Sequence, residues 1–72
     1  MPHYTVQIDW DDDASVWIAT SEDIPGLVLE SGSSDALVEK VRAAVPELLN
    51  LNGQPSTSMT IRIVSSRELA MA

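Results

Sequence analysis

Carboxylates are the side chains of this sequence best suited to chemistry. Asp9 precedes a run of three aspartates, Asp11-Asp12-Asp13, and Glu22-Asp23 follow a short apolar segment. Carboxylate oxygens are the ligands that Mg²⁺ and Ca²⁺ prefer. A calcium-binding EF-hand loop, however, needs spaced acids, a central glycine and a terminal glutamate, and the run lacks that order. We therefore predict that the aspartates form a solvated turn and that the chain holds no metal.

The sequence offers little else for catalysis. His3 is the only histidine and there is no cysteine, whereas a zinc site or a Ser-His-Asp arrangement needs further partners. We expect His3 to lie in a frayed terminus. The expectation is that the protein is not an enzyme and uses no cofactor.

Net charge limits the partners. Eleven acidic residues face four basic ones, giving −7. Such a surface repels phosphate backbones, which argues against direct nucleic-acid binding, and it attracts a basic protein. No segment has the length of a membrane span, and the first residues lack the features of a signal peptide. We therefore expect a cytoplasmic location and no membrane contact.

The size of the chain favours self-association. A chain of 72 residues buries only roughly 60% of its unfolded surface when it folds. Without cysteine it has no disulfide to supply the missing stability. Small domains often gain this stability by association, so we expect a homo-oligomer, most simply a dimer.

Periodicity predicts four strands and one helix. Tyr4–Trp10 alternates apolar and polar residues, and the strands Val16–Thr20 and Leu27–Glu30 follow. Ile24-Pro25-Gly26 forms a turn between them. The fourth strand is indicated by the alternating Met59, Ile61 and Ile63, after a loop over Gln54–Ser58.

In the sequence, the predicted helix follows the third strand and precedes the fourth. Ser33 or Ser34 caps its start, and Asn52-Gly53 ends it. Its apolar stripe consists of Leu37, Val41, Val45, Leu48 and Leu49. Because proline removes a backbone donor and crowds the preceding turn, we expect a kink or short break near Arg42–Pro46.

These elements predict an α+β fold of order β-β-β-α-β. The mostly antiparallel four-stranded sheet has the order 3-2-1-4 and carries the helix on one face. The domain covers residues 1–65, and residues 66–72 form a C-terminal tail. The second strand is apolar on both faces, with Val16 and Ile18 opposite Trp17 and Ala19. One face must be solvated or meet another chain.

Three segments resemble the HicB-like antitoxin superfamily: the longest resembles the N-terminal domain of the HicB-like antitoxin family, and the other two resemble a small, largely uncharacterised branch of that superfamily. The longest is Val16–Leu27, within which Asp23-Ile24-Pro25-Gly26 is most specific, and the others are Ser33–Leu37 and Val45–Leu49. The similarity covers roughly residues 4–64. It implies a partial ribonuclease-H-like fold without nuclease activity. Antitoxins of that family bind and mask a small, basic, RNA-cleaving toxin.

Our leading hypothesis is a non-catalytic binding module of antitoxin type. Its partner-binding residues would be the exposed acids and one aromatic anchor: Asp11, Asp12, Asp13, Glu22, Asp23 and Trp17. Trp is enriched at interfaces, although Trp10 and Trp17 could both be core residues. The alternative is a structural homo-oligomer or small-ligand-binding domain without a toxin. A metal-dependent nuclease is disfavoured because the carboxylates are not spread over several elements.

Overall fold

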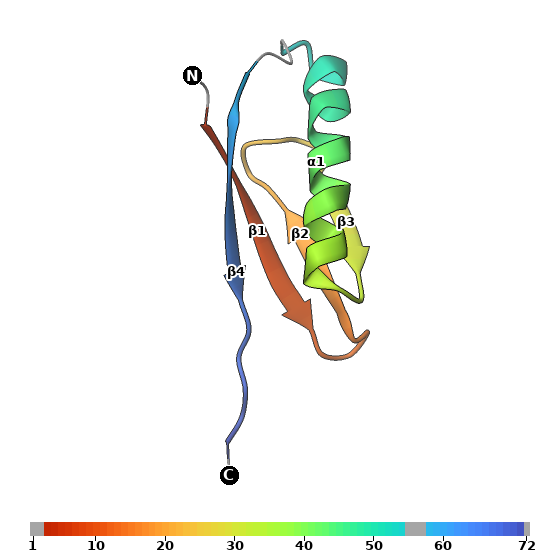
Figure 1. Ribbon diagram of the computed structural model, residues 1–72, viewed down its shortest axis with the longest axis vertical. Helices are drawn as coiled ribbons and strands as arrows, with labels where there is room; N and C mark the ends of the chain where they lie inside the picture. The colour runs from red at the N-terminus through yellow and green to blue at the C-terminus, as the bar shows by residue number, and fades with distance from the viewer. Residues whose placement is uncertain (1–2, 55–57, 72) are drawn as a thin grey trace.

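The computed structural model describes residues 3–54 and 58–71, which form one sheet and one helix (Figure 1). The elements are β1 (His3–Asp11), β2 (Val16–Thr20), β3 (Val28–Ser31), α1 (Ser34–Leu51) and β4 (Thr60–Ser66). The sheet has the order β3-β2-β1-β4. β2 is antiparallel to both β1 and β3, whereas β4 is parallel to β1. The predicted α+β fold and strand order are confirmed.

The bounds of β1, β3 and β4 differ from the prediction. His3 is not frayed, because it pairs with Thr60 at the start of the β1–β4 ladder. β3 begins at Val28 because Leu27 still belongs to the preceding turn. β4 continues to Ser66, which pairs with Asp9. The loop predicted over Gln54–Ser58 lies largely outside the described residues.

The core lies between α1 and one face of the sheet. The helix contributes Leu37, Val41, Val45 and Leu49, all buried, as the stripe predicted, and Leu48 is half-buried. The sheet and the loop after β2 contribute the other buried residues: Val6, Ile8, Ala19, Ile24 and Leu27. The strand alternation places Trp17 and Ala19 on this face, so Val16 and Ile18 lie on the face without a helix.

Local sequence fixes both ends of α1. The Ser33 hydroxyl accepts a hydrogen bond from the Ala36 amide at 3.3 Å, which satisfies an otherwise unpaired donor of the first turn. At the other end Gly53 has a φ of +76°. This allows the Gln54 amide to donate to the Leu49 carbonyl at 2.8 Å and the Gly53 amide to the Asn50 carbonyl, which is a Schellman ending.

Of the kink or short break predicted near Arg42–Pro46, the break is wrong, because α1 is continuous from Ser34 to Leu51 (Figure 1). A proline inside a helix leaves the carbonyl four residues earlier without its usual donor. That carbonyl belongs to Arg42, which is exposed, so water can replace the missing bond. The cost is therefore met at the helix surface rather than in the core.

The helix is not centred on the sheet. Backbone contacts join α1 to β2 and β3, but none joins it to β4 within the described residues. The helix-facing side of β4 is consequently the least covered part of the sheet. Ile63, at 37% exposure, is among the large apolar side chains that remain accessible.

We predict that Val41→Asp unfolds the domain. Val41 is 2% exposed at the centre of the buried stripe, and an unpaired buried charge costs several kcal/mol against a total stability on the order of 5 kcal/mol. Ala43→Asp is the matched control, because Ala43 lies on the exposed side of the same helix. Thermal melting by circular dichroism should show loss of the cooperative transition only for Val41→Asp. A wild-type melt for that variant would contradict the assigned core face.

Candidate interaction surfaces

The aspartate run forms the β1–β2 hairpin turn. The Asp11 carboxylate accepts hydrogen bonds from the amides of Asp13 at 3.0 Å and Ala14 at 3.3 Å, a local pattern typical of turns. Ser15 closes the turn with a φ of 55°. Asp11 is therefore half-buried and structural, whereas Asp12 and Asp13 are exposed.

The two tryptophans lie together next to this turn, on the helix-facing side of the sheet. Their ring centroids are 5.2 Å apart in an edge-to-face arrangement, and the Asp12 carboxylate accepts a hydrogen bond from Trp10 Nε1 at 3.0 Å. The Arg67 guanidinium lies 4.4 Å from the Trp10 centroid, within cation–π range. Trp17 also packs against the core, so it serves stability first and is only partly available as an anchor.

Glu22 and Asp23 lie at the other end of β2. The Asp23 carboxylate accepts the Thr5 amide at 2.7 Å, and the Ser21 hydroxyl donates to the Thr5 carbonyl at 2.5 Å. These side chains satisfy the β1 backbone just beyond the last β1–β2 pair, Gln7 with Thr20. Glu22 is exposed and makes no hydrogen bond within the described residues.

The segment Asp23-Ile24-Pro25-Gly26 has a structural explanation. Ile24 is fully buried, and its carbonyl accepts the Leu27 amide at 3.2 Å across the turn. Gly26 has a φ of +87°, which favours glycine. Asn52 Nδ2 donates to the Pro25 carbonyl and fastens the turn to the end of α1. The motif closes the open end of the core.

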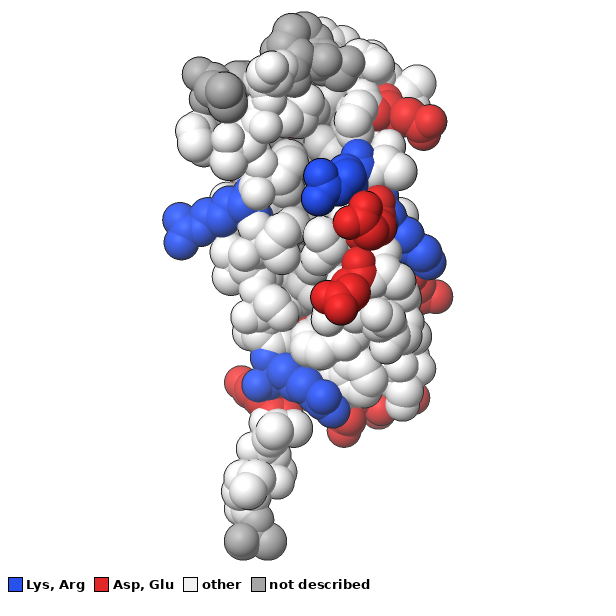
Figure 2. All heavy atoms as spheres, in the orientation of Figure 1, with Lys and Arg blue, Asp and Glu red and all other residues white. Residues whose placement is uncertain are grey.

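The predicted partner-binding acids therefore form two separate groups. β2 has five residues, so its end residues are about 13 Å apart at the usual rise per residue. Asp11, Asp12 and Asp13 lie at one end and Glu22 and Asp23 at the other. The hairpin end is the more acidic of the two, since Asp9, Asp12 and Glu68 border one shallow hollow beside Trp10. Acidic side chains are visible along the lower end of the body (Figure 2).

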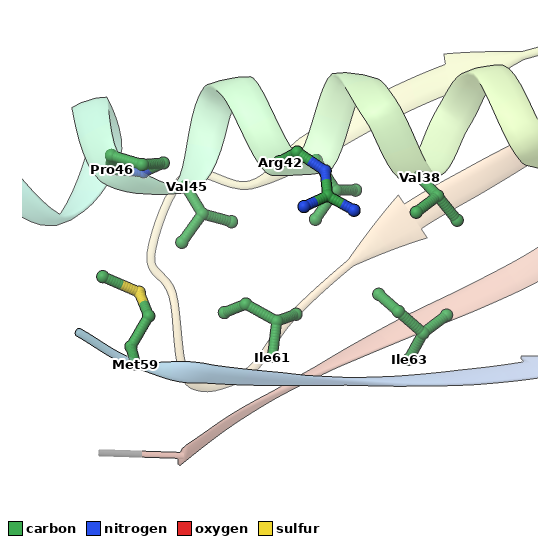
Figure 3. A pocket seen from close by; sticks show the side chains of 8 residues that line it. Val38, Arg42, Val45, Pro46, Met59, Ile61 and Ile63 are labelled. Atoms are coloured by element: carbon green, nitrogen blue, oxygen red, sulfur yellow. The ribbon is translucent and has the colours of Figure 1, made fainter. Parts of the chain in front are cut away.

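An apolar groove separates α1 from β4. Figure 3 shows Val38, Val45 and Pro46 on the helix facing Ile61 and Ile63 on β4 and Met59 just before it, with the Arg42 side chain between helix and strand. The groove has a volume of about 440 Å³ and is open to solvent along its length. It exists because the helix lies over β2 and β3 instead of the whole sheet.

Among residues 3–54 and 58–71, no three His, Asp or Glu side chains converge in a way that could hold a metal ion. No helix in the described part of the chain is long and apolar enough to cross a membrane.

Comparison with known proteins gives the family. The model of a family described as a domain of unknown function, DUF1902, matches residues 3–72. The chain belongs to the DUF1902 family. A solved structure of a hypothetical protein from the extremely thermophilic bacterium Thermus thermophilus is 37% identical, with a TM-score of 0.82. The similarity covers 96% of this chain and 99% of that protein. None of the curated proteins compared with the chain matches it.

The groove was not among the surfaces proposed from the sequence of this DUF1902 chain. The alternation of Met59, Ile61 and Ile63 was visible, but it indicated only that one face of β4 is buried. The sequence feature that could have shown that the helix covers only part of the sheet is the narrow apolar stripe of the helix. Its fully buried residues fall at four-residue intervals, which covers a band narrower than four strands.

We predict that Asp23→Ala destabilises the domain by about 1 kcal/mol, because the Thr5 amide loses a carboxylate acceptor. Glu22→Ala is the matched control, as it removes a neighbouring exposed carboxylate that makes no such bond. In urea denaturation, only Asp23→Ala should lower the urea concentration at the unfolding midpoint. Equal shifts for the two variants would mean that general charge, not this hydrogen bond, sets the effect.

Proposed function

We propose that this chain is a non-catalytic binding module of the HicB antitoxin type, which masks a small, basic, RNA-cleaving protein in the cytoplasm. The observation that carries the proposal is the excess of negative charge, −7 on a chain of 72 residues, with a concentration of exposed acids at the hairpin end. The sequence resemblance and the β-β-β-α-β order support the same function.

Two of the five candidate acids are engaged within the chain itself and are less available for such binding. Asp11 and Asp23 accept backbone amides of the chain itself, so they shape the loops. Asp12 and Asp13 are exposed at the hairpin tip and carry the electrostatic role in this proposal. Trp10, half-buried beside Asp12, supplies an aromatic edge, since tryptophan beside charged groups is a frequent interface anchor.

A masking module needs no catalytic residues of its own. Its carboxylates would contact the lysines and arginines with which the partner holds RNA phosphates. Carboxylates and phosphates are both anions and bind the same positively charged side chains. Exposed charges of this kind govern mainly the association rate and its dependence on salt. Buried contacts would then govern dissociation.

The partner to test is a small basic protein encoded beside the gene of this chain. We expect the isolated partner to cleave RNA, and to lose that activity when an equimolar amount of the chain is added. Cleavage that continues unchanged in the presence of excess chain would refute the masking function.

The hairpin acids are tested by binding kinetics with the same partner. Asp12→Asn combined with Asp13→Asn should slow association about tenfold at low salt and flatten its salt dependence, with little change in dissociation. The matched control is Glu39→Gln with Glu47→Gln, which removes the same charge from exposed helix positions. If both double variants slow association equally, the hairpin is not the docking site.

A further inference from the structure

The chain has an exposed apolar segment as well as an apolar groove. Residues 67–71, here called the tail, continue from β4 beyond the body of the domain (Figure 1). Leu69 is 68% exposed and Met71 is 88% exposed. In Figure 2 most of the tail appears as an uncharged projection. Neither large side chain is buried by its own domain, and the groove has uncovered apolar walls.

β4 also has an open edge. It lies at the end of the sheet with β1 as its hydrogen-bonded neighbour, and an edge strand of seven residues is long enough to pair with another strand. Prolines and bulges often block such edges, but Thr60–Ser66 contains no proline. The edge adjoins the groove, so a strand added there would also cover it.

We propose that a second copy of this chain pairs antiparallel along β4, so that the tail of each copy covers the groove of the other. The pairing joins two four-stranded sheets into one. This assembly does not depend on the proposed toxin partner.

Side-chain alternation fits this arrangement. Ile61 and Ile63 face the helix. Arg67 lies over Trp10 on the same side of the sheet, so the alternation continues into the tail and places Leu69 and Met71 there too. In an antiparallel pair, opposite residues point to the same face. The partner's apolar tail side chains therefore reach the groove side when odd-numbered residues lie opposite odd-numbered ones.

Charge selects one register. When Ser65 lies opposite the partner's Ser65, Arg62 lies opposite the partner's Glu68. The twofold symmetry then also places Glu68 opposite the partner's Arg62. Both are on the face away from the helix. The same register places the partner's Leu69 opposite Ile61 and the partner's Met71 opposite Met59, which are groove residues. The charged pair selects this alignment, and the apolar pairs at Ile61 and Met59 are compatible with it, while the partner's Arg67 lies opposite Ile63.

The distribution of charge also favours this edge. Residues 58–71 carry Arg62, Arg67 and Glu68, so their net charge is +1 and the remainder of the chain carries −8, from −7 − 1. Two acidic chains repel each other at most orientations. Contact through residues 58–71, which carry no net negative charge, keeps most of the acidic side chains out of the interface.

The apolar part of the interface is tested with Leu69→Asp. Leu69 is exposed in a single copy, so the variant should keep its cooperative melt. It should raise the dimer dissociation constant by about a hundredfold, because two leucines lose their buried site. Val28→Asp is the matched control: it adds the same charge at a residue that is 72% exposed on β3 and should leave the dimer within about threefold of the wild type.

The register is tested by charge reversal, with sedimentation equilibrium from micromolar to millimolar concentration. Arg62→Glu and Glu68→Arg should each weaken the dimer about tenfold, and the double variant should restore it. A general charge effect predicts instead that Glu68→Arg strengthens the dimer, since it reduces the net charge. That result would overturn the proposal, and so would failure of the double variant to restore binding. A wild type that is monomeric at millimolar concentration would also overturn it. So would a dimer that Val28→Asp dissociates and Leu69→Asp does not.

Discussion

A single helix cannot cover a four-stranded sheet, and the rest of this structure follows from that mismatch. Neighbouring strands are about 4.8 Å apart and a helix with its side chains is about 10–12 Å wide, so one helix spans roughly two or three strands. Here α1 lies over β2 and β3. The turn holding Ile24 and Leu27 closes one end of the core. The other side, along β4, keeps an open groove.

The arrangement separates two surfaces with different physical character. The hairpin end is acidic and polar, and its tryptophans are held by Asp12 and Arg67. The groove beside β4 is apolar, and among the described residues that line it Arg42 is the one that carries a charge. Because Asp12 and Asp13 lie outside β4 and the tail, a charged partner and a second copy can bind the same domain without competing for Asp12 or Ile61. The pairing at β4 would place two acidic hairpins in one assembly.

Much of the fold could be predicted because local and nonlocal signals agree. The alternation in β1, the cap at Ser33 and the stop at Gly53 each specify an element by its own residues. The error at Pro46 has a different origin, since the cost of a helical proline depends on whether the preceding carbonyl reaches water. That depends on which side of α1 faces the sheet, and here Arg42 lies on the exposed side.

The candidate surfaces were harder to predict from sequence. The aspartate run indicated a turn, but nothing in the sequence distinguishes Asp11, which holds the turn by two hydrogen bonds, from the exposed Asp13. Likewise Asp23 reads as a surface acid until its contact with Thr5, distant in the sequence, is known. The groove depends on the lateral position of the helix, which arises from packing across several elements and has no single local signature.

Completion of β4 by a second copy is tested most directly by hydrogen exchange, measured residue by residue as the protein concentration is raised. In a single copy the described tail amides, residues 67–71, are not paired in a strand, whereas the amides of β1 and α1 are already bonded. Pairing along β4 should protect the tail amides as concentration rises, while exchange of the hairpin amides of Asp12 and Asp13 should not change. Tail amides that exchange rapidly at every concentration would contradict it.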